Sequence, residues 1–273
     1  MNSKSILIVI PARYASTRLP GKPLHKIAGI EMIKRVAEIA ISVCEKYNNC
    51  DYIVATDDNK IVAFCEAKNI KVTMTAESCK SGTERCFDAV KKMENAPDFI
   101  INLQGDNPLC PPWFIEDMIN EWQKDKEGQV FTPCVHLTWE ELDRLRENKK
   151  TTPFSGTTVQ VDKLGYALTF SKLTLPAIRK EEKLREHTTK SPVRRHIGLY
   201  GYTHEALKDY FNLEPGQYEK PEGLEQMRFI EHRIPVKMVE VDYKGWQGMS
   251  GVDSPEDVER AEAIIAQQGE FNR

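Results

Sequence analysis

The stretch Ile6-Leu-Ile-Val-Ile10, followed at once by the polar segment Pro11–Pro23, decides the fold class. A run of apolar, mostly β-branched residues predicts a short parallel strand that is buried on both faces. The polar segment is rich in Arg, Ser, Thr, Pro and Gly, which is typical of a loop. Apolar residues then recur at helical spacing over Met32–Cys44. The chain therefore opens with a strand, a loop and a helix.

The same alternation continues through the first half of the chain. Further strands are expected at residues 52–55, 71–74 and 99–103, and further helices at residues 60–67 and 84–93. Strands that alternate with helices need crossover connections, which give parallel neighbours. The order predicts an α/β fold with a mostly parallel sheet and helices on both faces.

The second half is less regular and predicts an inserted β-rich lobe. Two strands at residues 157–161 and 166–170, joined by a short turn, predict a hairpin. Further strands are expected at residues 195–202 and 236–241, and helices at residues 112–123, 139–148, 205–212, 222–232 and 254–267. The charged run at residues 180–191 is expected to be a solvent-exposed loop. We expect one domain over residues 1–273, in which about 133–220 contain the smaller lobe.

Composition excludes several classes of protein. The 273 residues carry 38 Lys and Arg against 41 Asp and Glu, a net charge of −3, which argues against a nucleic-acid-binding protein. No apolar run approaches the roughly 20 residues of a membrane span, and no signal-peptide pattern is present, so we expect a cytoplasmic protein. Seven cysteines without a CxxC pair argue against a disulfide scaffold and a zinc site. We expect buried or half-buried thiols.

Polar loops follow the expected parallel strands, where open α/β sheets bind ligands. The first, Pro11–Pro23, carries Arg13, Arg18 and Lys22. Three cations in one loop favour a polyphosphate ligand, and the alternative is a solvated basic loop. The GxxxxGK[ST] and GxGxxG patterns are both absent, which argues against a Walker A loop and a dinucleotide fingerprint.

Two aspartates complete this pattern. Asp106 follows the strand at residues 99–103, so it either binds a divalent cation or caps the next helix. Asp253 lies just before Ser254-Pro-Glu-Asp257, a sequence typical of a helix N-terminus. Together the two carboxylates predict a Mg²⁺ site for phosphoryl or nucleotidyl transfer.

Eight segments carry a resemblance that runs in order along nearly the whole chain. They are Ile10–Leu24, Val54–Asp58, Met74-Thr75 with Ser81–Arg85, Asn102–Asp106, Tyr166–Leu168 with Phe170-Ser171, Arg195–Tyr202, Leu224–Arg228 and Gly251–Arg260. Jointly they resemble the CMP-Kdo synthetases, the 3-deoxy-manno-octulosonate cytidylyltransferases. The resemblance implies a nucleotide-binding α/β sheet with a smaller lobe that helps to form a homodimer. It also implies that CTP is joined to a small acidic sugar, which gives a CMP-sugar and pyrophosphate.

The resemblance also assigns roles to individual residues. Arg13 and Lys22 match positions that bind the triphosphate, and Ser81, Gly82 and Thr83 match a loop near the base. Asp106 and Asp253 match the Mg²⁺ ligands. The positions that line the acceptor pocket correspond to Gln104, Lys172, His196, Tyr200, Glu225 and Gln226.

Departures from the family pattern gather on the acceptor side. Asn107 replaces the usual Glu after Asp106, and Lys172 replaces an Arg that faces the acidic acceptor. A Lys usual in the strand at 157–161 is missing, and Pro221-Glu-Gly223 stands where the family has a more helical stretch. Kdo, an amino-Kdo, another ulosonic acid and a phosphonate all stay open as acceptors.

Other interpretations stay open for particular residues and for the function. His196 is either a pocket residue or a hydrogen-bonded core histidine. Tyr200 and Tyr202 share one face by period two, either near the pocket or in the core of the lobe. Two rival functions are a nucleotidyltransferase for a neutral sugar phosphate and a non-catalytic nucleotide-binding regulator.

Overall fold

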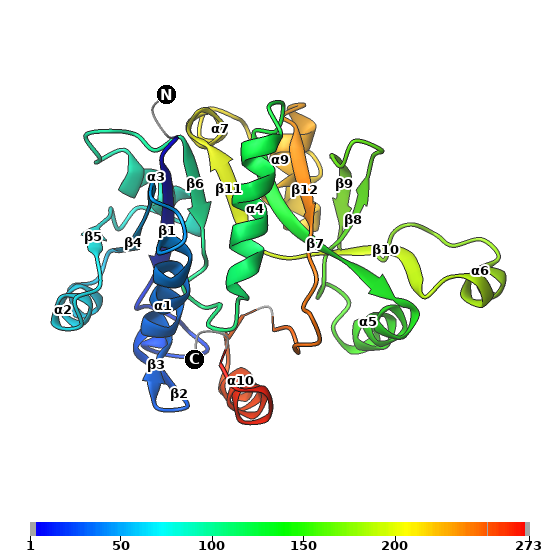
Figure 1. The fold of residues 1–273 in the computed structure, drawn as a ribbon, viewed down its shortest axis with the longest axis horizontal. Coiled ribbons are helices and arrows are strands. Elements are labelled where there is room, and N and C mark those ends of the chain that lie inside the picture. Colours follow the sequence, from blue (N-terminus) through cyan, green and yellow to red (C-terminus); the bar gives the residue numbers. More distant parts are fainter. Residues whose placement is uncertain (1–3, 250, 271–273) are drawn as a thin grey trace. The chain divides into compact units, whose positions relative to one another are not determined.

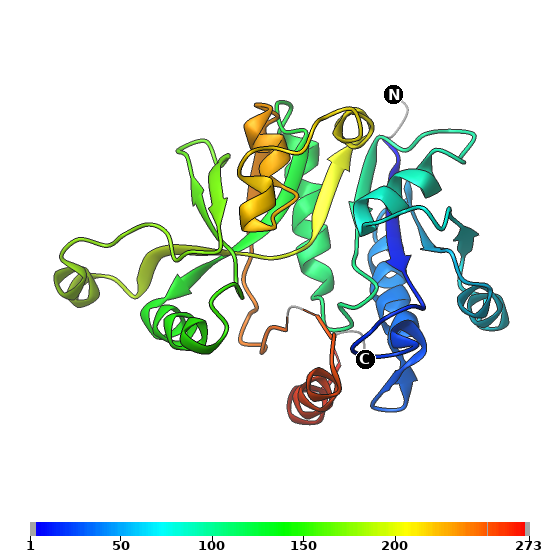
Figure 2. The same ribbon diagram turned by 180° about the vertical axis from the view of Figure 1, so that it is seen from behind.

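The computed structural model describes residues 4–249 and 251–270, which form two compact units (Figures 1 and 2). Of the described residues, unit 1 comprises 4–116, 199–208, 243–249 and 251–270, and unit 2 comprises 117–198 and 209–242. Two of the four boundaries between them fall within helices, α4 (Pro112–Lys124) and α7 (His204–Tyr210), and the other two fall between elements. No helix of the described residues has the length and apolarity that a membrane span requires.

Unit 1 has a mostly parallel sheet, as the sequence predicts. Its strand order is β5-β4-β1-β6-β11, in which only β11 runs antiparallel to its neighbour. All seven residues of β1 are buried, because helices α1 and α3 pack against opposite faces of the sheet (Figures 1 and 2). The elements are β1 (Ile6–Ala12), η1 (Lys22–Leu24), β2 (Lys26–Ile27), β3 (Ile30–Glu31), α1 (Met32–Cys44), β4 (Cys50–Thr56), α2 (Asn59–Ala67), β5 (Val72–Met74), α3 (Gly82–Val90), β6 (Phe99–Asn102), β11 (Tyr200–Thr203) and α10 (Pro255–Gln268).

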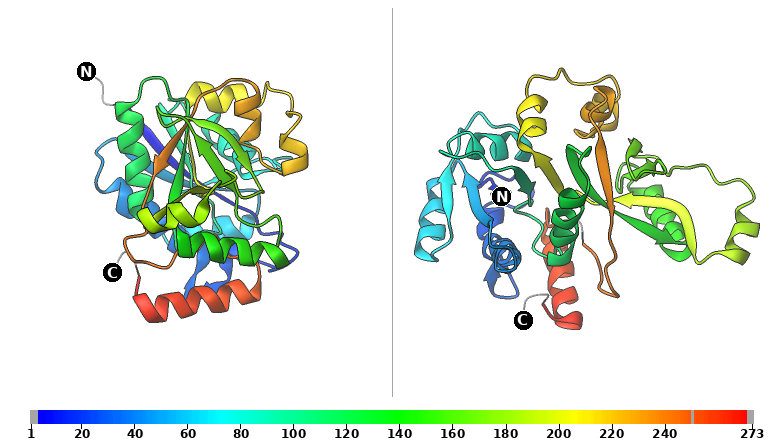
Figure 3. Two further views of the ribbon diagram at one scale, coloured as in Figure 1. Left: turned by 90° about the vertical axis from the view of Figure 1, so that its right-hand side faces the viewer. Right: turned by 45° about the horizontal axis from the view of Figure 1, so that its top comes forward.

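Unit 2 is built on a second set of strands, ordered β12-β7-β10-β8-β9. The β8–β9 hairpin is confirmed, and β9 approaches β12 through a bridge between Tyr166 and Lys237, so the sheet curls. Helix α5 packs on β7 and β10, and α9 packs on β9 (Figure 3). The elements are β7 (Val130–Thr138), α5 (Trp139–Thr151), β8 (Thr158–Val161), β9 (Ala167–Ser171), α6 (Glu181–His187), β10 (Lys190–His196), α8 (Glu219–Glu222), α9 (Met227–Glu231) and β12 (Val236–Glu240).

Two expectations for the second half of the chain are wrong, and one strand was not expected. The single strand expected at 195–202 is two strands that belong to different units. Strand β10 ends before Ile197-Gly-Leu199, and β11 begins after it. The single helix expected at 222–232 is α8 and α9, because Gly223 at φ 61° ends α8 in the left-handed conformation. Strand β7 was not expected, since Pro133 lies in its middle.

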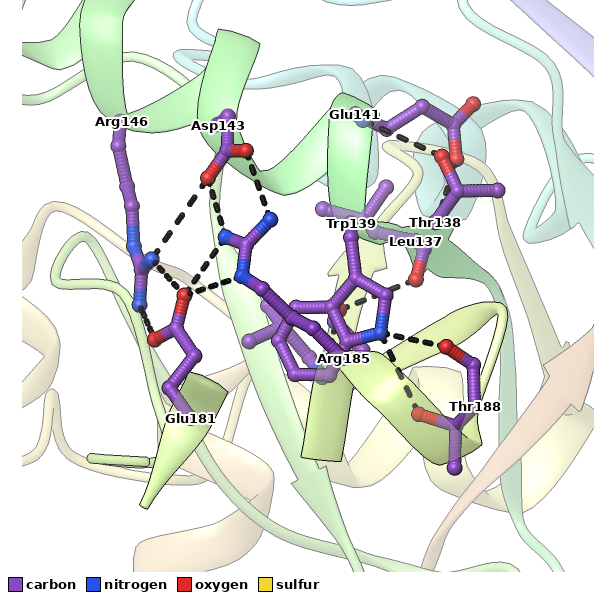
Figure 4. Close-up of polar contacts among 11 residues, drawn as sticks. Leu137, Thr138, Trp139, Glu141, Asp143, Arg146, Glu181, Arg185 and Thr188 are labelled. Atoms are coloured by element: carbon purple, nitrogen blue, oxygen red, sulfur yellow. Dashed lines mark hydrogen bonds and ion pairs between the residues drawn. The ribbon is translucent and has the colours of Figure 1, made fainter. Parts of the chain in front are cut away.

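Residues 180–191 are largely exposed, as expected, but they are not a loop, because they contain helix α6 and the first residues of β10. Acidic residues in its first turn and basic residues in its last suit the helix dipole. Arg185 pairs with Asp143 at 2.6 Å and Arg146 pairs with Glu181 at 2.8 Å (Figure 4). These pairs join α6 to α5. Hydrogen bonds from Arg146 and Arg185 outweigh burial and lower the pKa of Glu181 to about 2.

The cysteines are free thiols, five of them buried and two half-buried, which confirms their expected burial. Burial raises the pKa of Cys110 to about 12 and, against the charge of Arg194, that of Cys134 to about 12. A thiol is nucleophilic only as the thiolate, so these two side chains are inert at neutral pH.

Candidate active site

The loops after β1 and β6 are tied together at the carboxyl ends of these neighbouring strands. The Gly105 N–H donates to the Pro11 carbonyl at 3.3 Å. A Cβ atom at Gly105 would lie 2.6 Å from that carbonyl oxygen, so only glycine permits this close approach. This contact between Gly105 and Pro11 fixes the backbone position of the next residue, Asp106.

Lys22 draws Asp106 and Asp253 to one point. Its Nζ donates to Asp106 Oδ2 at 2.6 Å and to Asp253 Oδ1 at 3.0 Å. Arg18 forms an ion pair with the other oxygen of Asp253 at 3.2 Å. The Val252 N–H donates to the Asp106 carbonyl at 2.8 Å and holds the two loops together. Residues up to 231 positions apart therefore form one cluster of two cations and two carboxylates.

The alternative in which Asp106 caps a helix is excluded by its place in the structure. Helix α4 begins only at Pro112, and the Asp106 carboxylate binds Lys22 instead. Ser254 caps α10 as predicted, with Pro255 in the first turn and Asp257 completing the capping box. Asp253 lies just outside that cap, and its carboxylate forms ion pairs with Lys22 and Arg18.

The ionisation states of the cluster follow from its contacts. Burial alone would lower the pKa of Lys22, but the charges of Asp106 and Asp253 and their hydrogen bonds raise it above its ordinary value. Burial would likewise raise the pKa of Asp253, and the hydrogen bond and charge of Lys22 reverse this and lower it. Lys22 is therefore an ammonium and Asp253 a carboxylate at neutral pH.

The two carboxylates fit a Mg²⁺ ion of the kind that enters with a nucleotide. Magnesium prefers oxygen ligands and commonly takes one or two carboxylates plus phosphate oxygens and waters. Asp106 and Asp253 already converge on a cation, Nζ of Lys22. Among the residues described by the structure, no three His, Cys, Asp or Glu side chains group as a metal site. The protein alone would supply part of such an ion's ligands.

The residues expected near the nucleotide gather around the β5–α3 loop. The Arg13 guanidinium donates to the carbonyls of Cys79 and Lys80, which joins the loop after β1 to this loop. Ser81 caps α3 by accepting the Glu84 N–H at 3.2 Å. A Cβ atom at Gly82 would lie 3.0 Å from the Gln104 side-chain oxygen, so Gly82 lets Gln104 pack closely. Thr83 is buried at the start of α3.

Gln104 and Tyr200 lie at the carboxyl end of β6. Gln104 Nε2 donates to Asn102 Oδ1 at 2.9 Å, and Tyr200 of β11 pairs in register with Asn102. The rings of Tyr200 and Tyr202 stack with centroids 6.0 Å apart, which confirms that they share a face. Tyr202 is buried in the core, whereas Tyr200 is half-buried.

In unit 2, His196 and Lys172 are close enough to interact electrostatically. His196 Nε2 is 2.7 Å from Thr132 Oγ1, and its ring packs edge-on against Phe170. Burial, with a smaller contribution from the charge of Lys172, lowers the pKa of His196 to about 3. The imidazole is therefore neutral at physiological pH. Lys172 Nζ donates to Thr157 Oγ1 at 3.2 Å.

Glu225 and Gln226 lie on the turn between α8 and α9. Gln226 is buried, and Glu225 contributes, after burial, to raising the pKa of Tyr210. Glu222, at the end of α8, accepts hydrogen bonds from Ser171 Oγ at 2.8 Å and from the Lys172 N–H at 2.7 Å. The α8–α9 turn is thereby fastened to the end of β9.

The predicted site residues thus form two groups, one in each unit. Arg13, Lys22, Ser81, Gly82, Thr83, Gln104, Asp106, Tyr200 and Asp253 belong to unit 1, and Lys172, His196, Glu225 and Gln226 belong to unit 2. Sequence reasoning missed the pairing of Arg85 with Asp57 at 2.6 Å. The Arg85 side chain is fully buried and also donates to Thr75 Oγ1. An arginine on the inward face of α3, with an aspartate at the end of β4, was the available signal.

The comparisons with known proteins agree with this geometry. A family model described as cytidylyltransferase matches residues 7–237, which defines the class. Within it, the 3-deoxy-manno-octulosonate cytidylyltransferase of Maricaulis maris is 44% identical over 267 residues, covering 98% of this chain and 99% of that protein. The corresponding Zea mays protein is 36% identical over 258 residues, covering 94% and 80%. The chain belongs to the 3-deoxy-manno-octulosonate cytidylyltransferase family, the CMP-Kdo synthetases.

A solved structure shows the same likeness in three dimensions. A CMP:2-keto-3-deoxy-manno-octonic acid synthetase complexed with CTP matches with a TM-score of 0.83 and 34% sequence identity. The match covers 97% of this chain and 100% of that one. Both the fold class and the family predicted from the sequence are confirmed.

Proposed function

We propose that this protein transfers the cytidylyl group of CTP to Kdo or a closely related acidic sugar, giving a CMP-sugar and pyrophosphate. Family membership supports the class of reaction, and a relative of known structure is complexed with CTP. The single observation that carries the proposal is the convergence of Asp106, Asp253 and Lys22 at the carboxyl end of a parallel sheet. Such strand ends are where α/β proteins bind nucleotides.

In the proposed reaction a hydroxyl of the acceptor attacks the α-phosphorus of CTP in line, and pyrophosphate leaves. Lys22 and Arg13 bind the triphosphate and offset the negative charge that moves onto the leaving oxygens. Ser81, Gly82 and Thr83 form the turn beside the base. No covalent nucleophile is needed, which agrees with the raised pKa of buried thiols such as Cys110.

Asp106 and Asp253 would hold Mg²⁺ in this proposal. When bound, the ion would neutralise phosphate charge and favour the ionised form of the acceptor hydroxyl. The contribution of the chain is to keep two carboxylates fixed and ionised at one point. Backbone contacts of Gly105 and Val252 provide that fixation.

For the acceptor, we propose binding by Lys172, His196, Glu225 and Gln226 of unit 2, and a role for Gln104 and Tyr200 of unit 1 stays a prediction from the family resemblance. Lys172 is the group suited to an acidic acceptor, because its ammonium contacts a hydroxyl and, among the described residues, forms no ion pair. Neutral His196 can exchange hydrogen bonds with sugar hydroxyls without repelling a second cation.

We further propose a cytoplasmic homodimer. Seven free thiols suit a reducing compartment. Leu164, Leu168 and Leu173 lie on and beside the outer strand of unit 2 and are largely exposed. A second copy of the chain that covers them would bury this apolar surface, and sedimentation analysis of wild type against Leu168→Lys tests that arrangement.

Pyrophosphate release tests the proposed reaction. The wild-type protein is incubated with Mg²⁺, Kdo and each of CTP, UTP, ATP and GTP, and with CTP alone. Release that requires both CTP and an acidic sugar supports the proposal. Release with a neutral sugar phosphate, or nucleotide binding without any release, would replace it with one of the two rival functions.

A further inference from the structure

Lys22 already occupies the point on which the two carboxylates converge. Its Nζ contacts one oxygen of Asp106 and one of Asp253, and the Lys22 side chain is only 16% exposed. With Arg18 on the second oxygen of Asp253, the cluster contains two positive and two negative groups. The nucleotide-free site is therefore close to electrically neutral.

We propose that Lys22 is the resident cation of the Asp106–Asp253 pair in the nucleotide-free protein, and that a divalent ion gains both carboxylates only when a triphosphate draws Lys22 away. The inference rests on the proposed function and adds an order of events. Metal enters the site with the nucleotide, and the free protein binds divalent cations weakly.

The local structure allows the ammonium to move while the backbone stays in place. Lys22 opens the short helix η1, where its N–H donates to the Leu19 carbonyl at 3.1 Å and Gly21 precedes it at φ 68°. Pro23 is buried in the same turn. The flexible four-carbon stem of the lysine can carry Nζ between the carboxylates and a phosphate, whereas the turn is fixed.

Electrostatics explain why the two cations compete. A divalent ion placed on both carboxylates would lie within a few ångströms of an ammonium in the same cluster. The repulsion between the two positive charges is strong at such a short separation. A triphosphate relieves it by offering Lys22 other anionic partners.

Arg18 cannot replace Lys22 in this role. Among the described residues it forms an ion pair with Asp253 alone, and its side chain is 67% exposed, so water screens its charge. Removal of Arg18 should therefore change metal binding less than removal of the Lys22 charge.

Binding of Mn²⁺ alone, measured by electron paramagnetic resonance without nucleotide, tests the proposal. Lys22→Met keeps the length of the stem and removes the charge, and we expect it to tighten Mn²⁺ binding about tenfold or more relative to wild type. Lys26→Met is the matched control, since Lys26 lies nearby but pairs with Glu31 at 3.8 Å instead. It should bind Mn²⁺ as wild type does.

Two further variants make the outcome decisive. Lys22→Arg keeps the positive charge and should bind Mn²⁺ as weakly as wild type, and it serves also if Lys22→Met is unstable. Adding Asp253→Asn to Lys22→Met should remove the gain. Equal Mn²⁺ affinity in wild type and Lys22→Met, or a gain that survives Asp253→Asn, would overturn the proposal. Pyrophosphate release by the wild-type protein reports separately on the proposed function.

Discussion

The two groups of candidate site residues differ in how their charges are balanced. In unit 1, Lys22 and Arg18 neutralise Asp106 and Asp253 at hydrogen-bonding distance. In unit 2, the Lys172 ammonium contacts only the Thr157 hydroxyl, within the described residues. The first group can exchange its internal partners for a metal and phosphates, whereas the second offers an uncompensated cation to an anionic ligand.

The groups also differ in what holds them. Backbone hydrogen bonds place Asp106 after the end of β6 and hold the segment before α10, which carries Asp253, against it. Lys172 is placed by side chains, because the Lys149 ammonium donates to its carbonyl at 2.6 Å and Glu222 accepts its N–H. A site held by strand ends is fixed by the fold, and a site held by side chains can change by substitution. This agrees with family departures that gather on the acceptor side.

The largest effect is expected at the carboxylates of unit 1. Asp106→Asn and Asp253→Asn should each lower turnover about a thousandfold or more, because losing a metal ligand costs several kcal/mol of transition-state stabilisation. Asp51→Asn is a suitable control, since it removes a surface carboxylate that also pairs with a lysine, Lys71. Near-normal pyrophosphate release by both site variants at low Mg²⁺ would show that Asp106 and Asp253 do not hold a catalytic metal ion.

The second effect separates rate from affinity at Lys22. Lys22→Met should lower kcat about a hundredfold with a smaller change in the KM for CTP, because a point charge on the phosphates is most effective as charge moves in the transition state. The Lys26→Met protein provides the reference values. A change confined to KM would make Lys22 a binding residue only.

A smaller effect is expected at the acceptor cation of unit 2. A planar guanidinium binds a carboxylate with two parallel hydrogen bonds, which one ammonium cannot reproduce. Lys172→Arg should therefore raise kcat/KM for Kdo about tenfold, and wild type should use a related acid, such as an amino-Kdo or a phosphonate, comparatively well. If wild type prefers Kdo more than a hundredfold and Lys172→Arg brings no gain, the substitution at this position is neutral.

The sequence predicted unit 1 more closely than unit 2, for physical reasons. Helix α1 lies at Met32–Cys44 as expected, since its apolar spacing is local information. The meeting of Lys22 with Asp106 followed from the rule that parallel strands present their carboxyl ends at one edge, whereas Asp253 precedes α10 and does not follow a strand. That rule needs only strand order, which the alternation of strands and helices supplies.

The features that escaped prediction depend on distant partners. Helix α6 is short and exposed, and Arg185 secures it to Asp143, 42 residues away. Strand β7 contains Pro133 yet pairs with β12, at the far end of unit 2 in sequence. The buried Arg85 is tolerated because Asp57 pairs with it. A polar or proline-containing segment carries no local sign of such partners.

The last effect is expected from acid and concerns stability and not turnover; it tests whether His196 is neutral beside Lys172. The folded protein holds the pKa of His196 near 3, against an ordinary value of 6.5. Between these values the unfolded chain binds a proton that the folded protein does not, so stability is present above pH 6.5 and is lost as the pH falls toward 3. The loss is at most about tenfold in the unfolding equilibrium for each pH unit. The free energy of unfolding is measured in urea from pH 7 to pH 4. Its pH dependence should show that His196→Gln takes up one proton fewer on unfolding than wild type does. His187→Gln, on the surface of α6, is the control and should behave as wild type. Identical slopes for wild type and His196→Gln would mean that His196 is charged in the folded protein, and the proposed acceptor residues of unit 2 would then include two cations, Lys172 and His196.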